Sequence, residues 1–104
     1  MPKSPREKFS ENLRCIRAKR DMSQEEVARL TEMHRTEISL LERGRREPRL
    51  GTLIRLSAVL EAPLGEFFEG IDWVPLVPEV ATPGRFVVGP VKDDSAPANP
   101  LLPR

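Results

Sequence analysis

The densest group of chemically capable side chains in the sequence is a run of arginines at positions 43, 45, 46 and 49. Guanidinium groups bind phosphates and carboxylates through paired hydrogen bonds. The alternative is a solvated loop, since charge runs usually face water. The chain of 104 residues has 17 basic and 16 acidic side chains and a formal net charge of +1. Only the local clustering therefore favours a phosphate-bearing partner.

Groups suited to catalysis or to metal binding are sparse. His34 and Cys15 are single, whereas a structural zinc site needs four ligands. The glycines form no phosphate-cradling loop, and the adjacent Glu25 and Glu26 would diverge on a helix. We expect no enzyme activity, no metal and no cofactor. By position, His34 is a capping or phosphate-adjacent residue, and Cys15 is expected to be a plain, partly exposed thiol.

Two capping boxes mark the first helix starts. Ser4 and Glu7 flank a proline at the first helical position, which predicts a helix from there to about residue 20. Ser23 and Glu26 repeat the pattern and predict a short helix that ends near Thr31. Two further periodic segments predict a fourth helix around 53–60 and a short fifth around 64–68.

A third helix is expected to begin at His34, directly after a short turn, and to end before Gly44. Two short helices joined by about three residues form a helix-turn-helix. At about 100° per residue, Ile38 and Leu41 point one way. The opposite face is small, polar and basic, and a helix of that kind fits the DNA major groove. It comprises Thr36, Ser39, Leu40 and Arg43, with Arg35 on its flank.

Proline spacing divides the chain into two parts. Seven of the 11 prolines follow residue 70, which excludes a further helix of useful length. We expect a helical DNA-binding domain at 5–70 and a Pro-rich, mostly extended C-terminal extension at 71–104. Residues 85–88 could add a short strand, and residues 93–104 are expected to be disordered.

Three sequence segments together resemble the phage-repressor-type (XRE, Cro/repressor-like) helix-turn-helix family. They are Ser23–Ala28, Ile38–Pro48 and Leu53–Leu60, and the resemblance covers roughly residues 6–69. It implies an all-α, compact five-helix, lambda-repressor-like domain that binds double-stranded operator DNA, usually as a homodimer on a palindrome. Short proteins of this type also resemble controllers of restriction–modification operons and antitoxins that repress their own operon.

The resemblance also implies roles for individual residues. The base-reading positions are Arg35, Thr36 and Leu40, with an additional contact from Ser39. Phosphate contacts are implied for Gln24, Arg43, Arg45 and Arg46, and a structural ion pair for Arg17 and Glu42. Leu40 has two interpretations, contact with a thymine methyl group or packing on helix four.

Apolar residues near the fifth helix are the expected dimer interface, because so small a core leaves some of them uncovered in a monomer. They are Leu64, Phe67, Phe68, Ile71 and Trp73. For Trp73, closing the bottom of the core and recognising a bound peptide are the alternatives.

Two positions depart from the family pattern. Glu32 stands in the turn where glycine is common, so a residue with a side chain is expected at positive φ. Arg49 stands where a small capping residue often begins helix four.

The leading hypothesis is a sequence-specific, homodimeric DNA-binding transcription regulator, by default a repressor, with helix three in the major groove. The alternative is a protein-interaction module or antitoxin-like protein that binds a partner through the C-terminal apolar surface and the tail. No apolar run approaches the roughly 20 residues of a membrane span. We therefore expect a soluble chain without membrane contact, cytoplasmic if the source is bacterial.

Overall fold

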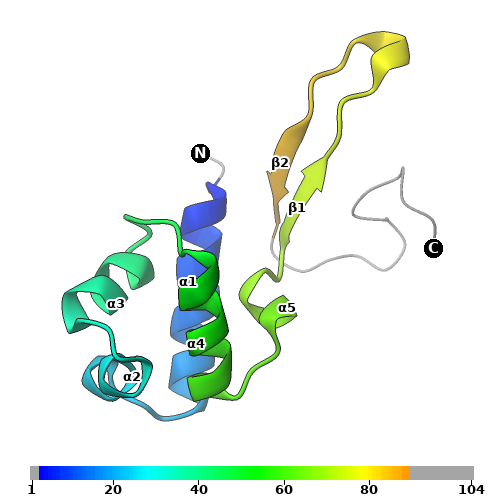
Figure 1. The fold of residues 1–104 in the computed structure, drawn as a ribbon. Helices are drawn as coiled ribbons and strands as arrows, with labels where there is room; N and C mark the ends of the chain where they lie inside the picture. Colours follow the sequence, from blue (N-terminus) through cyan, green and yellow to red (C-terminus); the bar gives the residue numbers. More distant parts are fainter. Residues whose placement is uncertain (1–2, 90–104) are drawn as a thin grey trace.

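The computed structural model describes residues 3–89, which form a helical body and a projecting β-hairpin (Figure 1). The expected disorder at 93–104 concerns residues outside this range. The helices are α1 (Pro5–Lys19), α2 (Gln24–Thr31), α3 (Arg35–Glu42), α4 (Leu50–Leu60) and α5 (Leu64–Phe67). The hairpin consists of β1 (Ile71–Val74), a 3-10 turn (Pro78–Val80) and β2 (Arg85–Val88). Five helices were expected, and the described residues contain them.

Both predicted capping boxes are present. The Glu7 backbone N–H donates to the Ser4 hydroxyl at 3.2 Å, and the Ser4 N–H donates to the Glu7 carboxylate at 3.0 Å. This backbone hydrogen bond from Ser4 lowers the pKa of Glu7 from its ordinary value of 4.5. Ser23 and Glu26 repeat the arrangement at the start of α2. The chain therefore begins these two helices where its own side chains satisfy free backbone donors.

The turn between α2 and α3 has the positive φ that was expected at Glu32. Glu32 lies in the left-handed region, with φ 60° and ψ 40°. Directly after it, the Met33 N–H donates to the Ala28 carbonyl at 2.9 Å, and α3 begins at Arg35. The prediction of positive φ at Glu32 is confirmed, and the left-handed residue allows α3 to leave α2 at a sharp angle.

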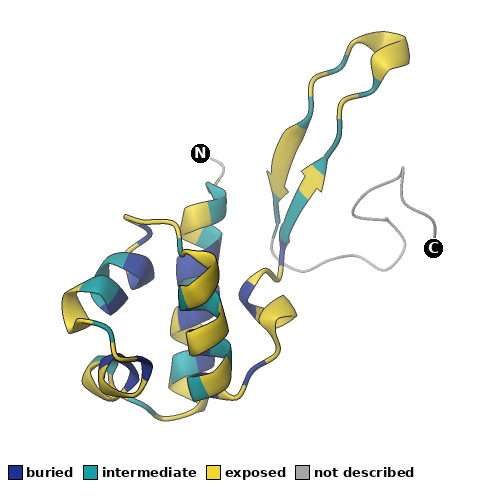
Figure 2. Cartoon of the chain, in the orientation of Figure 1, coloured by how far each residue is buried: buried dark blue, intermediate teal, exposed yellow. Residues whose placement is uncertain are grey.

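The core lies where all five helices, α1 to α5, face one another, as the buried residues of Figure 2 show. Phe67 stacks on Phe9, with ring centroids 6.2 Å apart. Asn12 fixes the end of α5 by donating to the carbonyls of Phe67 and Glu69 at 3.0 and 2.9 Å. The largest fully buried side chains are Val27, Leu13, Ile38, Leu41, Leu56, Leu60 and Phe67.

The hairpin corrects the expectation of an all-α chain with a mostly extended tail. β1 and β2 pair in antiparallel register, with Ile71 opposite Val88 and Trp73 opposite Phe86. The Trp73 and Phe86 rings meet edge to face, 5.0 Å apart at an angle of 68°. The prolines at 75, 78 and 83 lie between the paired segments and so remove no ladder hydrogen bond. β2 covers the residues singled out as a possible strand, whereas β1 was not predicted.

Candidate nucleic-acid interface

Helix α3 is fixed to the body by its apolar side and presents its polar side outward. Ile38 and Leu41 are fully buried. Arg35 and Thr36 are exposed, and Ser39 and Leu40 are half-buried. The structure thus brings the four expected base-reading residues to one outer surface of α3.

The buried carboxylate of Glu42 joins α1, α2 and α3. Its side chain is only 3% exposed. Arg17 on α1 donates to both of its oxygens, Nε to Oε2 at 2.5 Å and Nη2 to Oε1 at 2.9 Å. Gln24 at the start of α2 donates its Nε2 to Oε1 at 3.1 Å. The hydrogen bonds from Arg17 to Glu42 raise the pKa of Arg17. The bond from Gln24 holds this side chain in place at the first residue of α2.

Two arginines of α1 also bind backbone carbonyls, one at the end of α3 and one just before α2, a role that sequence reasoning did not assign. Arg14 donates to the carbonyl of Glu42, the last residue of α3. Arg17 donates Nη1 to the Met22 carbonyl at 2.8 Å. Gly44 then lies at φ 69°, with the Arg45 N–H donating to the Leu40 carbonyl at 3.0 Å. The spacing of Arg14 from Arg17 along one helix face was the only available signal for this cap.

The loop and helix arginines differ in what they contact. Arg43 and Arg45 are exposed, and the Nε of Arg43 approaches the Ser39 carbonyl at 3.4 Å. Two other arginines form ion pairs. Arg35 Nε lies 2.9 Å from Glu25 Oε1, and Arg46 Nη1 lies 2.5 Å from Glu37 Oε1. Neither glutamate was a predicted site residue, because each partner is close only after α2, α3 and the loop are folded together.

His34 and Arg49 cap their helices through backbone conformation. His34 precedes α3 with φ −71° and ψ 143°, and its exposed side chain makes no capping hydrogen bond. Arg49 precedes α4, also without a side-chain cap. Both side chains therefore remain at the surface on which α3 lies.

The expected dimer surface needs one correction. Phe67 is fully buried in the core of the single chain, where it packs against Phe9, so it cannot form a contact surface for a partner. Leu64, Phe68 and Trp73 are exposed, and Ile71 is half-buried.

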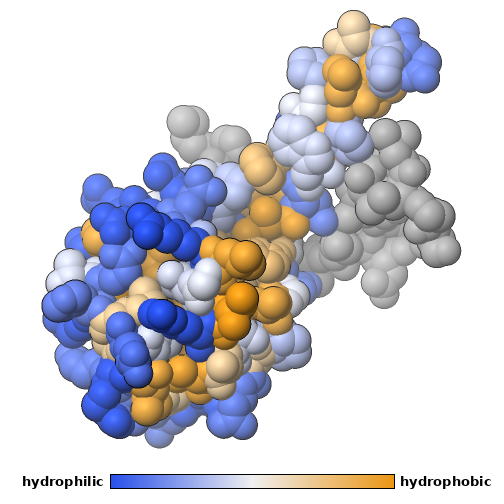
Figure 3. Space-filling view, in the orientation of Figure 1, coloured by the Kyte–Doolittle hydropathy of each residue, from blue (hydrophilic) through white to orange (hydrophobic). Residues whose placement is uncertain are grey.

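Two exposed apolar residues of α4 were missed. Leu50 is 73% exposed and Ile54 53% exposed, and Figure 3 shows apolar side chains gathered over this helix. The signal was available, because α4 has more apolar positions than its single buried stripe of Leu56 and Leu60 requires.

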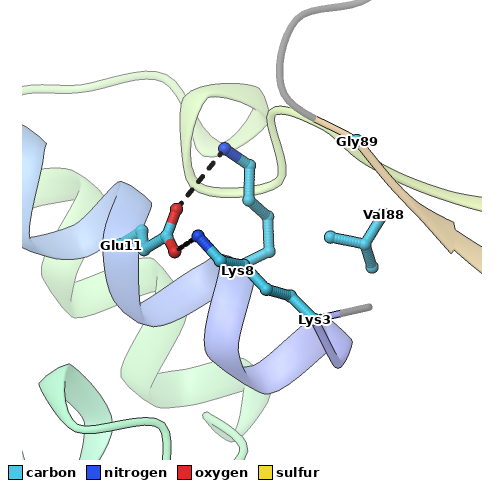
Figure 4. Close-up of a pocket in the computed structure, with 5 residues that line it drawn as sticks. All are labelled: Lys3, Lys8, Glu11, Val88 and Gly89. Atoms are coloured by element: carbon cyan, nitrogen blue, oxygen red, sulfur yellow. Dashed lines mark hydrogen bonds and ion pairs between the residues drawn. The ribbon is translucent and has the colours of Figure 1, made fainter. Parts of the chain in front are cut away.

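A separate cleft lies between the start of α1 and the base of the hairpin (Figure 4). Its volume is about 250 Å³, and its lining includes Lys3, Lys8 and Val88. Glu11 forms ion pairs with both lysines, at 3.9 Å in the case of Lys8. None of the expected DNA-contacting residues lines this cleft, so it is distinct from the surface of α3.

Comparisons with known proteins agree with this geometry. Residues 13–67 match the family HTH_3, described as helix-turn-helix. A search of curated proteins gave no match. None of the helices within residues 3–89 combines the length and apolar character needed to cross a bilayer.

Three solved structures illustrate the similarity. The restriction-modification controller protein C.AhdI from Aeromonas hydrophila is 32% identical, with a TM-score of 0.59 over 61% of this chain and 96% of its own. A mutant of the restriction-modification controller protein C.Esp1396I is 31% identical, with a TM-score of 0.58 over 65% and 86%. The clp gene regulator ClgR from Corynebacterium glutamicum is 27% identical, with a TM-score of 0.61 over 64% and 71%.

The matched segment begins in α1 and ends with α5, so it contains the whole helix-turn-helix and the Glu42 hydrogen bonds that hold it. The hairpin lies outside it. The chain therefore belongs to the HTH_3 family of helix-turn-helix proteins and has a transcription-regulator-like fold.

Proposed function

We propose that this protein is a homodimeric, sequence-specific repressor that inserts α3 into the major groove of a palindromic operator. The observation that carries the proposal is the asymmetry of α3. Its inner side is buried and bound through Glu42 to α1 and α2, while Arg35 and Thr36 face outward. A rigid helix with an exposed polar face is the element that direct readout of base edges requires.

Within this proposal, Arg35 donates to O6 and N7 of a guanine. Thr36 and Ser39 contact neighbouring base edges. Leu40 is half-buried, which leaves part of its side chain available to a thymine methyl group. Phosphate contacts come from Gln24, His34, Arg43, Arg45 and Arg46, which provide affinity and register but no base discrimination.

The apolar surface of the helical body supports the proposed homodimer. Ile54 and Leu50 on α4 are exposed, as are Leu64 and Phe68 around α5. An isologous interface that buries them would place two copies of α3 on one side of the dimer. Half-sites would then be separated by about 34 Å, one turn of DNA. Occupation of a promoter by such a dimer would block transcription.

The similarity to two restriction-modification controller proteins supports a narrower role. Both are among the structures at about 30% identity, and this chain covers 96% and 86% of their lengths. We infer that this protein likewise regulates the promoter of an operon. Expression of that operon is then set by the concentration of the regulator itself.

A second candidate function rests on the hairpin. Trp73 and Phe86 form an exposed aromatic pair outside the matched segment. A protein partner, such as a toxin in an antitoxin-like complex, would find there an apolar contact surface that DNA does not need. Both activities are compatible within one chain, because the hairpin and α3 lie apart (Figure 1).

Selection of random duplex DNA by the purified full-length protein tests the main proposal. At ~150 mM salt, non-specific phosphate binding is weak. The proposal predicts enrichment of a palindrome. A folded protein that enriches no sequence would reject it and favour the partner-binding function.

A further inference from the structure

The two ion pairs on the proposed DNA-binding surface engage different edges of their arginines. Glu25 contacts the Nε of Arg35, at 2.9 Å. Glu37 contacts the terminal Nη1 of Arg46, at 2.5 Å. A guanidinium presents five N–H donors in a planar fork, so the edge that a carboxylate occupies determines which donors are left for DNA.

We propose that Glu25 positions Arg35 for guanine recognition, whereas Glu37 competes with DNA phosphate for Arg46 and so limits affinity. The inference rests on the proposed function and deepens it. Removal of one negative charge beside each arginine would then have opposite effects on DNA binding.

Glu25 positions Arg35 because it binds the side of the guanidinium nearest the Cδ. The Glu25 contact is at Nε, and the terminal Nη1 and Nη2 are the two parallel donors that match the O6 and N7 acceptors of guanine. Both side chains are exposed, so Arg35 without Glu25 would sample many rotamers before binding. Ordering such a side chain on association lowers affinity.

Glu37 acts differently because it occupies the donor that would reach a phosphate. It lies on the flank of α3, half-buried, and lines a cleft of about 200 Å³ with Arg46, Glu47 and Arg49. While Nη1 is paired with Glu37, Arg46 offers phosphate only its remaining donors, so full use of its fork on the DNA backbone requires it to leave Glu37. The carboxylate that remains is then close to phosphates and repels them. Both effects act on every DNA sequence.

The test compares Glu25→Ala and Glu37→Ala on the selected operator, on the operator with its contacted guanine replaced, and on random duplex DNA. Glu25→Ala is expected to weaken operator binding about three- to ten-fold and to reduce the penalty for replacing the guanine. Glu25→Gln keeps an oxygen that accepts from Nε and should restore most of that discrimination. Glu37→Ala is expected to strengthen binding to all three DNAs, by up to about five-fold.

Glu47→Ala is the matched control, since Glu47 lines the same cleft as Glu37 and Arg46 and is absent from the ion pairs found within residues 3–89. It removes the same charge and should strengthen binding less than Glu37→Ala does. A measurement without DNA separates the ion pair from general electrostatics. In arginine side-chain NMR, rotation of the Arg46 guanidinium should become faster in Glu37→Ala and stay unchanged in Glu47→Ala.

Opposite directions for the two variants would support the inference. If the wild type binds the operator and both variants shift affinity in the same direction, the inference is wrong and the proposed function stands. If the wild type binds no DNA, the proposed function fails and the inference falls with it.

Discussion

The carboxylate of Glu42, the last residue of α3, is bound on both oxygens by the guanidinium of Arg17 in α1. Because α3 has only eight residues, its own backbone hydrogen bonds are too few to make it stable alone. The bidentate pair therefore fixes the direction of α3 relative to α1, and Gln24 joins the same carboxylate to α2. The orientation of the proposed recognition helix is thus a property of the folded body.

Removal of this pair should destabilise the protein substantially. For Glu42→Ala we expect the free energy of unfolding to fall by about 2–3 kcal/mol, because Arg17 and Gln24 lose their shared acceptor. The loss is smaller than the roughly 3–5 kcal/mol of a fully buried pair, since Arg17 remains partly in contact with water. Urea denaturation monitored by circular dichroism measures the change.

Arg20→Ala is the control for the Glu42 variant. It removes another arginine near the end of α1 that pairs with a glutamate, Glu61, but both of these side chains are exposed. The expected loss is below about 1 kcal/mol. Equal losses in the two variants would show that the Glu42 pair has no special structural role.

The loop arginines should contribute sequence-independent affinity. Arg45 is exposed, and Arg45→Ala is expected to weaken binding to operator and random duplexes by the same factor. The slope of log K against log salt concentration should fall in magnitude by about one, since one phosphate contact is lost. Fluorescence anisotropy over a salt series measures both. An unchanged slope would remove Arg45 from the DNA contact surface.

The apolar surface of α4 makes a prediction about assembly. Ile54 is 53% exposed in the single chain, so Ile54→Glu should leave the fold intact. It should convert the dimer to a monomer, because a two-fold interface would bury two carboxylates facing each other. Sedimentation velocity measures the mass, and affinity for a full palindrome should fall far more than affinity for a half-site. Val80→Glu, at a 68% exposed position of the hairpin, should remain dimeric. A dimeric Ile54→Glu protein would place the interface elsewhere.

The hairpin can be tested through its single tryptophan. A Cβ added at Gly84 would lie 2.5 Å from Cζ2 of Trp73 and 3.1 Å from the Val74 carbonyl oxygen. Gly84→Ala should therefore displace the indole from Phe86 and change its fluorescence emission, with DNA affinity unaffected. Gly51→Ala is the control, because nothing lies within 4 Å of a Cβ built there. An emission spectrum unchanged by Gly84→Ala would contradict this packing.

Local signals in the sequence were sufficient to predict the helices. Ser4 and Ser23 cap α1 and α2 within their own segments. Positive φ at Glu32 was expected because glycine is common at this turn position in the family that the sequence resembles. The hairpin was harder to predict. Ile71–Val74 contains only four paired residues, and its partner begins more than ten residues later, after three prolines. Proline density therefore suggested an extended tail.

The candidate site shows a similar limit. The outward positions of Arg35 and Thr36 follow from helical periodicity, which depends on sequence spacing alone. The ion pairs of Arg35 with Glu25 and Arg46 with Glu37 join separate elements. The burial of Phe67 depends on how α5 closes against Phe9. Such contacts are set by tertiary packing, which local patterns do not specify.

The most direct test of the central claim is the affinity of Arg35→Ala for the selected operator and for random duplex DNA at the same salt concentration. The claim that α3 reads bases through Arg35 predicts a loss of about 1–3 kcal/mol on the operator. It also predicts a much smaller loss on random DNA and relaxed selection at one base position in each half-site. Equal losses on both DNAs would contradict it, because Arg35 would then contact only the phosphate backbone.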